Sequence, residues 1–507
     1  MDASPAASHA SNLETARPLH TEKVSRFSLI GLLGLLVAVY WPVLQFDFVN
    51  WDDPWYVLNN PLITSWHPYN LWRIATEFNV KNYAPLTTLS LLIDHTLFGK
   101  SPGGYHLMNV VLHGVNAVLV LLLVTRLTDN PSIGLATAAL FAVHPLQIET
   151  VAWVSSRKTL LCSVFMLASG RCWLRPDRIG RDELRGTVWL ALALLTKAAA
   201  IVLPPIVLAY DVVVRRKTIA DALPRQLVPG FLCFLLLRIT MSAQNSVMGG
   251  VRGHLGMSKL QILGIDSVIV WKYVGMLAWP SGLSVLYDPP TEGMLLPIAL
   301  SSLAWISVGI ICWKTWQRLP LLSWSVITWF LLLFPVLNFF PITTLMNDRY
   351  MYLPCISAFG LASGAVVWLS REIADRVASS TCARGRVNAL VTGGIGVAAV
   401  FGYASVTSSY LPVWRDGLSL WENAVERVPQ LPVVQIQWAD ALHDSGQIER
   451  GIVVLEETLQ LREPDEPDRQ RIEERISLWH GEVRLHPQDE VKLPADWENR
   501  EILLKGI

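Results

Sequence analysis

The 507-residue sequence has little charge for its length. Charged residues make up 16% of the chain, whereas soluble domains average about 25%. Lysine and arginine total 41, and aspartate and glutamate also total 41, so the formal net charge is zero. A chain without a basic excess lacks the electrostatic footprint of a nucleic-acid-binding protein. We therefore expect no nucleic-acid partner.

Cysteines are also few, and their spacing does not indicate a shared metal site or a set of disulfides. The six are Cys162, Cys172, Cys233, Cys312, Cys355 and Cys382. They form neither the short spacings of a zinc site nor a paired disulfide framework. We expect them to be small apolar core residues. No ligand set predicts a metal ion, although the sequence is compatible with a divalent cation.

A cleavable signal peptide is a further absence. Residues 1–26 are polar and lack the short apolar core and small-residue cleavage site of such a peptide. The long apolar run at 28–46 that follows is therefore predicted to be an uncleaved first membrane span.

Long apolar runs are what the chain has in abundance. Hydrophobic residues make up 52% of the sequence and gather in blocks of about 20, the length that crosses a bilayer core as a helix. The pattern predicts an all-α, polytopic membrane helix bundle with about eleven spans. They are expected at 28–46, 105–126, 132–146, 151–169, 187–200, 201–214, 226–241, 295–313, 321–338, 350–369 and 387–409. The segment 260–280 contains Lys272 and ends at a Pro-Ser-Gly break, so a partial or re-entrant helix is expected there.

Basic residues assign a side to each loop. Lys23 and Arg26 precede the first span, and cytoplasmic loops carry an excess of lysine and arginine. With that end cytoplasmic, alternation places nearly every other basic cluster on the same side: Arg126; Arg171, Arg175, Arg178, Arg181 and Arg185; Arg215, Arg216 and Lys217; Lys314 and Arg318; and Arg371, Arg376, Arg384 and Arg386. We predict a cytoplasmic tail at 1–27, a membrane domain at 28–409 with an external loop at 47–104, and an external domain at 410–507.

Four basic residues break this pattern, because they lie at the outer ends of spans. They are Arg157, Lys158, Lys197 and Arg349. Snorkelling of a long side chain to the headgroups explains any single one. Four together indicate an anionic group held near the outer membrane surface.

One span carries a polar face. In "YHLMNVVLHGVNAV" the residues His106, Asn109, His113 and Asn116 recur at i, i+3, i+7 and i+10, within an arc of about 80° on a helix. Such a face looks into the bundle or a water-filled cavity. Hydrogen bonding between helices is the simpler reading for the deeper pair. His106 and Asn109, near the outer mouth, are candidates for lining a site.

Acidic residues gather on the same predicted side. In "FVNWDDPWYVLNN" the chain leaves the first span and presents Asp52 and Asp53. In "FAVHPLQIETVAWVSSRK" the pair His144–Pro145 ends one helix, and Glu149 opens the next, where it caps the helix or lines a site. The stretch "LMNDRYMYLP" adds Asp348 and Arg349 at another outer helix start.

Together these groups suit transfer of a sugar from a lipid-linked phosphate. The leaving group is already a phosphate, so a cation such as Arg349, with Lys197 or Arg157, can stabilise its departure. The acceptor hydroxyl needs a general base, for which Asp52 and Asp53 are candidates. Neighbouring residues of an extended stretch face opposite sides. We favour Asp53, because Pro54 stiffens its backbone.

The last hundred residues are polar and read as paired amphipathic helices. The pattern of Ala439, Ala441, Leu442 and Gly446, with Pro464 beyond, fits one tetratricopeptide unit of about 34 residues. Fewer than three repeats are marginally stable alone. We therefore expect this helical, tetratricopeptide-like domain to pack on the membrane domain or on a partner.

An ordered series of motifs resembles the TMTC-type O-mannosyltransferases, which join a membrane glycosyltransferase of the GT-C fold to tetratricopeptide repeats, and their bacterial relatives. The series is "FVNWDDPWYVLNNP", "NYAPLTTLSLLIDHTLFG", "GYHLMNVVLHGVNAVL", "ALFAVHPLQIETVAWVSSRKTLL", "LTKAAAIVLPPIVLAYD", "NDRYMYLP" and "VWRDGLSLWENAVERVP". It runs from about residue 46 to 460.

The resemblance implies inverting transfer of mannose from a polyprenyl-phosphate donor to serine or threonine. The residues alone leave the acceptor open between a protein, a lipid and a glycan. The resemblance places the catalytic carboxylate in the first external loop, at Asp52 or Asp53. The enzyme would be an integral protein of a bacterial inner membrane or of the endoplasmic reticulum, with its active site on the external or lumenal face.

Two positions depart from the family. Relatives often carry arginine where this chain has Ala84, and an acid where it has Thr159. Two other readings therefore stay open. One is a transporter or lipid flippase, which explains the spans and the polar face but not an external loop of this length. The other is an inactive membrane scaffold that recruits partners through its helical tail.

Overall fold

The computed structural model describes residues 24–78, 82–175, 177–248, 257–338, 344–461, 464 and 466–485. The long elements in these ranges are helices. The prediction of an all-α chain is confirmed.

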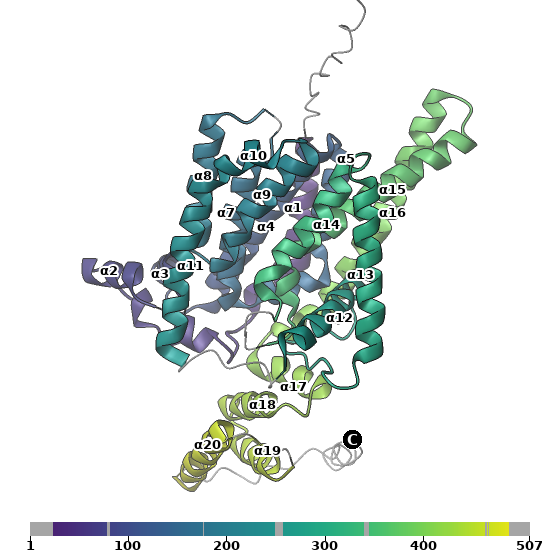
Figure 1. The fold of residues 1–507 in the computed structure, drawn as a ribbon. Helices are drawn as coiled ribbons and strands as arrows, with labels where there is room; N and C mark the ends of the chain where they lie inside the picture. The colour runs from purple at the N-terminus through teal and green to yellow at the C-terminus, as the bar shows by residue number, and fades with distance from the viewer. Residues whose placement is uncertain are drawn as a thin grey trace, which may run out of the picture.

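A bundle of helices forms the body of the protein (Figure 1). Its members are α1 (Arg26–Tyr40), α4 (Pro102–Thr128), α5 (Pro131–Val143), α6 (Ile148–Ala152), α7 (Arg157–Trp173), α8 (Gly180–Leu194), α9 (Leu203–Ala209), α10 (Ile219–Ala222), α11 (Leu227–Met248), α12 (Lys259–Ala278), α13 (Leu295–Thr315), α14 (Pro320–Leu333), α15 (Pro354–Val377) and α16 (Thr381–Tyr410). Several begin with proline, which is preorganised for the first helical position and has no N–H to leave unsatisfied there.

Six helices in the described ranges are long and apolar enough to cross a membrane, and a seventh is added if the bent pair Pro131–Val143 and Pro145–Ala152 counts as one span. Ala198–Val214 and Pro320–Val336 are shorter apolar helices. The protein is a multi-pass integral membrane protein, but eleven spans remain a prediction. Length and hydropathy miss helices such as α7 and α8, because both are short and carry charged residues in their first turns.

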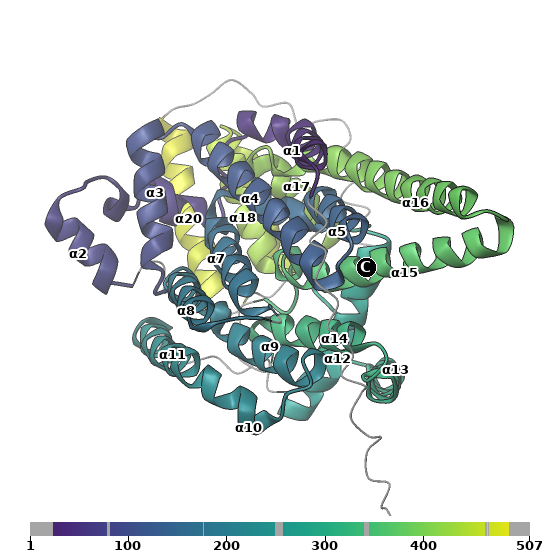
Figure 2. The ribbon, with the colours of Figure 1, turned by 90° about the horizontal axis from the view of Figure 1, so that it is seen from above.

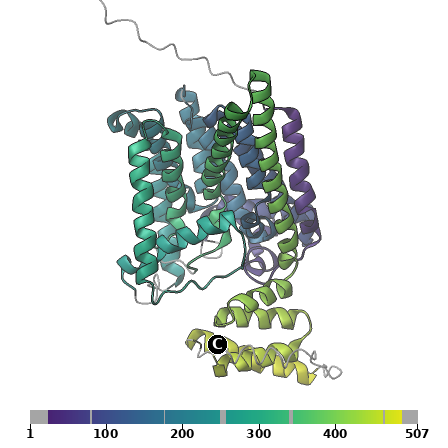
Figure 3. The same cartoon turned by 90° about the vertical axis from the view of Figure 1, so that its right-hand side faces the viewer.

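The segment expected to be a partial helix forms the continuous helix α12, which is apolar enough to span. Figures 1 and 3 draw α12 obliquely, near the end of the bundle from which the C-terminal helices extend. The break after it is real: Gly282 has a φ of +70°, a conformation that glycine adopts without a Cβ penalty.

The two ends of the bundle differ. At one end lie the loop helices α2 (Pro68–Thr76) and α3 (Pro85–Phe98) and the C-terminal helices α17 (Gly417–Arg427), α18 (Pro432–Asp444), α19 (Ile448–Leu461) and α20 (Glu466–Leu485). The hairpin between α15 and α16 and the connection from α7 to α8 lie at the other (Figures 1 and 3). Seen along the bundle, α2 projects sideways from it (Figure 2). The predicted external segments thus share one end.

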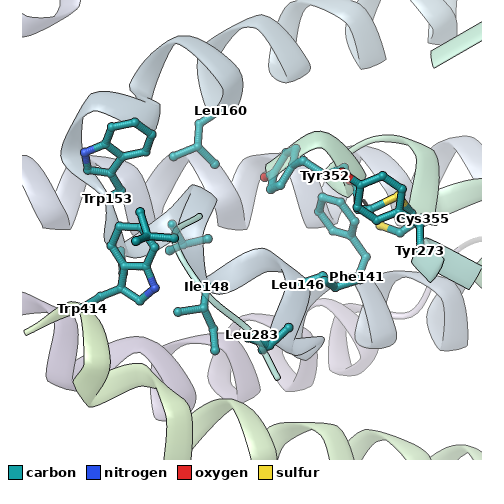
Figure 4. Packing of buried hydrophobic residues seen from close by; sticks show 14 of the residues in the cluster. Phe141, Leu146, Ile148, Trp153, Leu160, Tyr273, Leu283, Tyr352, Cys355 and Trp414 are labelled. Carbon is teal, nitrogen blue, oxygen red and sulfur yellow. Dashed lines mark hydrogen bonds between the residues drawn. The ribbon is translucent and has the colours of Figure 1, made fainter. Parts of the chain in front are cut away.

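The core runs through the bundle to the base of the C-terminal helices. Tyr352 lies edge-on to Phe141, with ring centroids 5.1 Å apart, and Trp153 lies 6.2 Å from Trp414 (Figure 4). Aromatic pairs of this kind add about 0.5–1.5 kcal/mol beyond burial. The second pair joins the turn before α7 to the segment that leads into the tail.

The polar face of α4 looks into the bundle, as predicted. His113 contacts the Tyr352 hydroxyl at 2.8 Å and the Ala142 carbonyl at 3.1 Å. Asn116 donates to the Leu160 carbonyl at 3.0 Å and to Tyr352 at 3.1 Å. The deeper pair therefore bonds neighbouring helices together. All six cysteines are free, and Cys382 is exposed rather than part of the core.

Candidate functional site

Asp53 is a buried member of the turn that follows α1. Its side chain is 1% exposed. One carboxylate oxygen accepts from the Val49 amide at 3.1 Å, and the other accepts from the Ser155 amide at 3.0 Å and the Ser155 hydroxyl at 2.5 Å. Asp53 therefore ties the first loop to the turn that precedes α7.

Burial dominates the protonation of this group. It raises the pKa of Asp53 to about 7, although the hydrogen bonds from Ser155 and Val49 act to lower the pKa, and the neighbouring Asp52 charge raises it slightly. The Ser155 hydroxyl can donate to the carboxylate or accept from the protonated acid. Both protonation states can thus be satisfied in place.

Asp52 takes the opposite orientation. Its side chain is 32% exposed, and one carboxylate oxygen lies 3.8 Å from the Lys158 ammonium. The prediction that this stretch is extended is wrong, because Asp53 has helical backbone angles (φ −61°, ψ −35°). The two acids nevertheless have different surroundings. The sequence favoured Asp53 as the general base. The structure buries Asp53 against Ser155 and leaves Asp52 the more exposed of the two acids.

Cations surround this turn. The Lys158 ammonium lies 4.7 Å from the centre of the Tyr56 ring and 3.3 Å from the Tyr56 hydroxyl. Lys197 donates to the Thr159 hydroxyl at 3.0 Å, and it interacts electrostatically with Lys158, Arg349 and Glu149. A hydroxyl in place of a carboxylate at Thr159 contributes no negative charge, so the ammonium of Lys197 is not neutralised by this neighbour.

Glu149 fixes the third cation. The Arg349 guanidinium is ion-paired with one Glu149 oxygen, and the Arg349 amide donates to the other at 2.7 Å. The guanidinium also lies 5.2 Å from the Trp153 ring and 5.3 Å from the Tyr350 ring. Its side chain keeps 15% exposure. Burial acts to lower the pKa of Arg349, but the charge and hydrogen bond of Glu149, together with Tyr350 and Asp52, outweigh it and raise the pKa, so Arg349 stays charged. Glu149 therefore positions Arg349.

Asp348 is buried beside this pair. It accepts from the Tyr287 hydroxyl at 2.6 Å, and the Lys272 ammonium lies 5.3 Å from the Tyr287 ring. Burial, together with the negative charge of Glu149, raises the pKa of Asp348 well above its ordinary value. Asp348 links the segment after α12 to the Arg349 turn.

Arg157 has a different environment from Arg349. It is 1% exposed and bonded on all sides. Its guanidinium pairs with Asp94 at 2.6 Å and donates to Asn109 at 2.6 Å and to the Tyr105 carbonyl at 2.9 Å. Burial raises the pKa of Asp94 against the opposing effect of Arg157. These contacts join α3, α4 and α7.

The remaining predicted residues are also buried. Asn109 donates to the Trp153 carbonyl at 3.0 Å, besides receiving Arg157. The His106 ring lies 3.3 Å from the Asp47 carbonyl. His144 contacts the Leu277 carbonyl at 3.1 Å through one ring nitrogen and accepts from the Leu146 amide through the other. These side chains support the loop and the helix ends rather than line an open surface.

The structure thus brings together Asp52, Lys158, Lys197 and Arg349, which we call the outer cluster. Glu149 and Asp348 stand behind it. Sequence reasoning missed Tyr56 and Ser155, and it noted Lys158 without choosing it as a site residue. The motif "SSRK" placed Ser155 and Lys158 at the mouth, but nothing in the sequence paired them with the two acids.

Two large apolar pockets lie elsewhere. One of about 1360 Å³ is lined by α1, α5, α14, α15 and α16, and one of about 1070 Å³ by α4, α7, α14 and α15. Neither is lined by the outer cluster. Within the described part of the chain, no group of three His, Cys, Asp or Glu side chains is arranged to hold a metal ion.

Comparison with known proteins gives distant relatives. No family model matches the chain. It is 34% identical over 195 residues to human protein O-mannosyl-transferase TMTC3, which covers 36% of this chain and 21% of that protein. It is 28% identical over 200 residues to Caenorhabditis elegans protein O-mannosyl-transferase F38B6.6, covering 37% and 28%, and 33% identical over 179 residues to human protein O-mannosyl-transferase TMTC4, covering 30% and 24%.

The chain is therefore a distant homologue of TMTC O-mannosyl-transferases over about 36% of its length, and its matched segment spans between 21% and 28% of those relatives. Among solved structures, ArnT from Cupriavidus metallidurans bound to undecaprenyl phosphate aligns with a TM-score of 0.39 at 14% identity, over 80% of each chain. The Archaeoglobus fulgidus oligosaccharyltransferase tethered with an acceptor peptide aligns with a TM-score of 0.41 at 14% identity, over 76% of this chain and 56% of that one. These scores are too low to transfer any feature to this chain.

Proposed function

We propose that this protein is a membrane glycosyltransferase of the GT-C type, which transfers a sugar from a polyprenyl-phosphate donor to a hydroxyl acceptor. One observation carries the proposal: Asp52 lies partly exposed among the cations Lys158, Lys197 and Arg349 at a helix-bundle end. The distant homology to O-mannosyl-transferases supports mannose as the sugar and a serine or threonine hydroxyl as the acceptor.

In the proposed step Asp52 takes the proton from the acceptor hydroxyl. The hydroxyl oxygen forms a bond to the anomeric carbon of the sugar, and the bond from that carbon to the phosphate oxygen breaks. The electron pair leaves with the polyprenyl phosphate, whose charge Arg349, Lys158 and Lys197 stabilise. A single displacement inverts the anomeric centre. The step as written uses only side chains of this chain and the two substrates.

The other predicted residues act indirectly in this proposal. Glu149 and Asp348 hold the Arg349 turn, and Asp53 holds the Asp52 turn through Ser155. Arg157, His106, Asn109 and His144 fix the helix ends beneath. The active site would face the exterior of a bacterial inner membrane or the lumen of the endoplasmic reticulum, where the donor arrives laterally within the bilayer.

A direct transfer assay tests the proposal. The full chain in nanodiscs is mixed with polyprenyl-phosphate mannose and a peptide rich in serine and threonine. We expect a glycosylated peptide by mass spectrometry and an inverted anomeric configuration by NMR. Polyprenyl-phosphate glucose in a parallel reaction tests sugar choice.

The same assay separates the competing functions. A flippase would move the labelled donor between leaflets of proteoliposomes without consuming it. An inactive scaffold would neither move nor consume it. Failure to consume any polyprenyl-phosphate sugar, with every acceptor class supplied, would rule out the glycosyltransferase.

A further inference from the structure

The C-terminal helices make a specific contact with the turn that carries Asp52. The Asn50 side chain donates to the Gln437 carbonyl at 3.0 Å and accepts from the Trp421 indole N–H at 2.9 Å. Trp421 is fully buried. Its ring also meets the Trp51 ring edge-on, with centroids 5.2 Å apart. We call Asn50, Trp421 and the Gln437 carbonyl the Asn50 clamp.

The backbone reinforces this clamp. The Asp47 amide donates to the Arg415 carbonyl at 2.8 Å. Gly417 opens α17 directly against Asn50: a Cβ built there would lie 2.3 Å from the Asn50 side-chain oxygen. A close approach of this kind requires glycine. Residues 47–51 are therefore contacted from the tail side at three positions, Asp47, Asn50 and Trp51.

The membrane domain holds Asp52 from the other side, where its carboxylate lies 3.8 Å from the Lys158 ammonium. Asp53, the next residue, is fixed by Ser155 in the membrane domain. The acid-bearing turn is thus suspended between two anchors, Ser155 at the bundle and the Asn50 clamp at the tail. The tail anchor is distant in sequence, since Trp421 lies 371 residues after Asn50.

We propose that the C-terminal helical layer positions the general base, with Asn50 as the positioning residue through which Trp421 and Gln437 set the place of Asp52. This inference rests on the proposed glycosyltransferase function. The C-terminal helices then help to position the reacting group of the active site, in addition to any role in binding an acceptor.

Three substitutions release the clamp in different ways. Trp421→Phe removes the indole N–H and keeps a large aromatic ring. Asn50→Leu keeps the size of the side chain and removes both of its hydrogen bonds. Gly417→Ala introduces a methyl group that forces the Asn50 oxygen away. Trp479→Phe is the matched control, because Trp479 is also a buried tryptophan of the tail, but its ring stacks on His443, with centroids 4.7 Å apart, instead of contacting the loop.

The experiment measures transfer kinetics and backbone exchange in the same full-length samples. We expect kcat to fall roughly ten- to a hundredfold in the three clamp variants, since a small misplacement of a reacting group can cost about a hundredfold. The KM for the donor should stay within twofold, because Arg349, Lys158 and Lys197 are untouched. Hydrogen–deuterium exchange should rise at residues 47–58, and Trp479→Phe should match the wild type in both readouts.

The results separate this inference from the proposed function. If the clamp variants speed exchange at 47–58 but keep wild-type kcat, or if donor KM rises while kcat holds, positioning is overturned. If exchange at 47–58 is unchanged in all three variants, the clamp itself is overturned. If the wild type transfers no sugar, the proposed function fails without any variant, and the exchange measurement alone then decides whether the tail holds the turn.

Discussion

Arg157 and Arg349 look alike in the sequence and are opposites in the structure. Both lie at the outer end of a predicted span, whereas most basic residues of the chain lie on the predicted cytoplasmic side. Arg157 is sealed by Asp94, Asn109 and the Tyr105 carbonyl. Arg349 is held from one side by Glu149 and keeps exposure on the other. A cation in the wrong place therefore marks a site only if some of its hydrogen-bonding capacity is left for a ligand.

The adjacent acids repeat the contrast. Asp53 is buried and accepts three hydrogen bonds, whereas Asp52 is partly exposed and faces a lysine. One member of each pair maintains the fold, and the other is available for chemistry. Substituting one residue of a pair while keeping the other should therefore separate the two roles.

The largest stability effect is expected for Arg157→Met. It leaves the buried Asp94 without its cation, and breaking a buried ion pair costs about 3–5 kcal/mol. Thermal unfolding in detergent should show a strong loss. The double variant Arg157→Met with Asp94→Leu should recover part of it, and Lys158→Met, next in sequence but more exposed, should unfold close to the wild type. A melting midpoint unchanged by Arg157→Met would contradict the structural role.

The pH dependence of stability should report Asp53. Its pKa is raised from an ordinary value near 4 to about 7, so the folded protein binds the proton more tightly than the unfolded chain. This contribution is fully present below about pH 4 and is lost as the pH rises to about 7, by about 1.4 kcal/mol per pH unit.

Asp53→Asn should flatten the pH dependence in that window, measured as the midpoint of thermal unfolding between pH 4.5 and 8. Asp52→Asn provides the matched comparison and should keep the wild-type slope. Identical slopes in the wild type and Asp53→Asn would mean that Asp53 is not the titrating group.

Arg349 should act on the donor. Arg349→Gln removes charge-assisted hydrogen bonds worth about 1.5–3 kcal/mol, so affinity for polyprenyl phosphate should fall roughly ten- to a hundredfold in a nanodisc binding titration. Arg376→Gln, an exposed arginine at the other end of the bundle, is the control. Equal affinities in both variants would remove Arg349 from the donor site.

Thiol labelling tests whether the two ends of the bundle lie on opposite sides of the membrane. In intact cells, an impermeant thiol reagent should label Ser101→Cys and Ser445→Cys, which lie at the end of the bundle that carries the loop and tail. The exposed native Cys382 and an Arg181→Cys variant lie at the opposite end and should stay unlabelled. Labelling of Arg181→Cys together with protection of Ser445→Cys would contradict the predicted topology and show the opposite one.

The sequence predicted the helices well because each apolar run is a local signal. The polar face of α4 could also be predicted, since its period comes from one helix. The site was harder, because its geometry is set by contacts between distant residues. Arg157 meets Asp94, Asp53 meets Ser155 and Asn50 meets Trp421, and each pair joins different elements. No local pattern distinguishes Asp52 from Asp53 without Ser155.

The most direct test of the account compares Asp52→Asn with Asp53→Asn in the transfer assay, with folded protein quantified for each. Both changes keep the shape of the side chain and remove its basicity. Loss of general-base help costs about a hundred- to ten-thousandfold in rate. The account predicts that loss in the transfer rate of Asp52→Asn at unchanged stability. The transfer rate per folded molecule of Asp53→Asn should stay within about tenfold of the wild type, because the asparagine keeps a side-chain oxygen that can accept from Ser155. Full turnover in Asp52→Asn, or its loss only in Asp53→Asn, would contradict it.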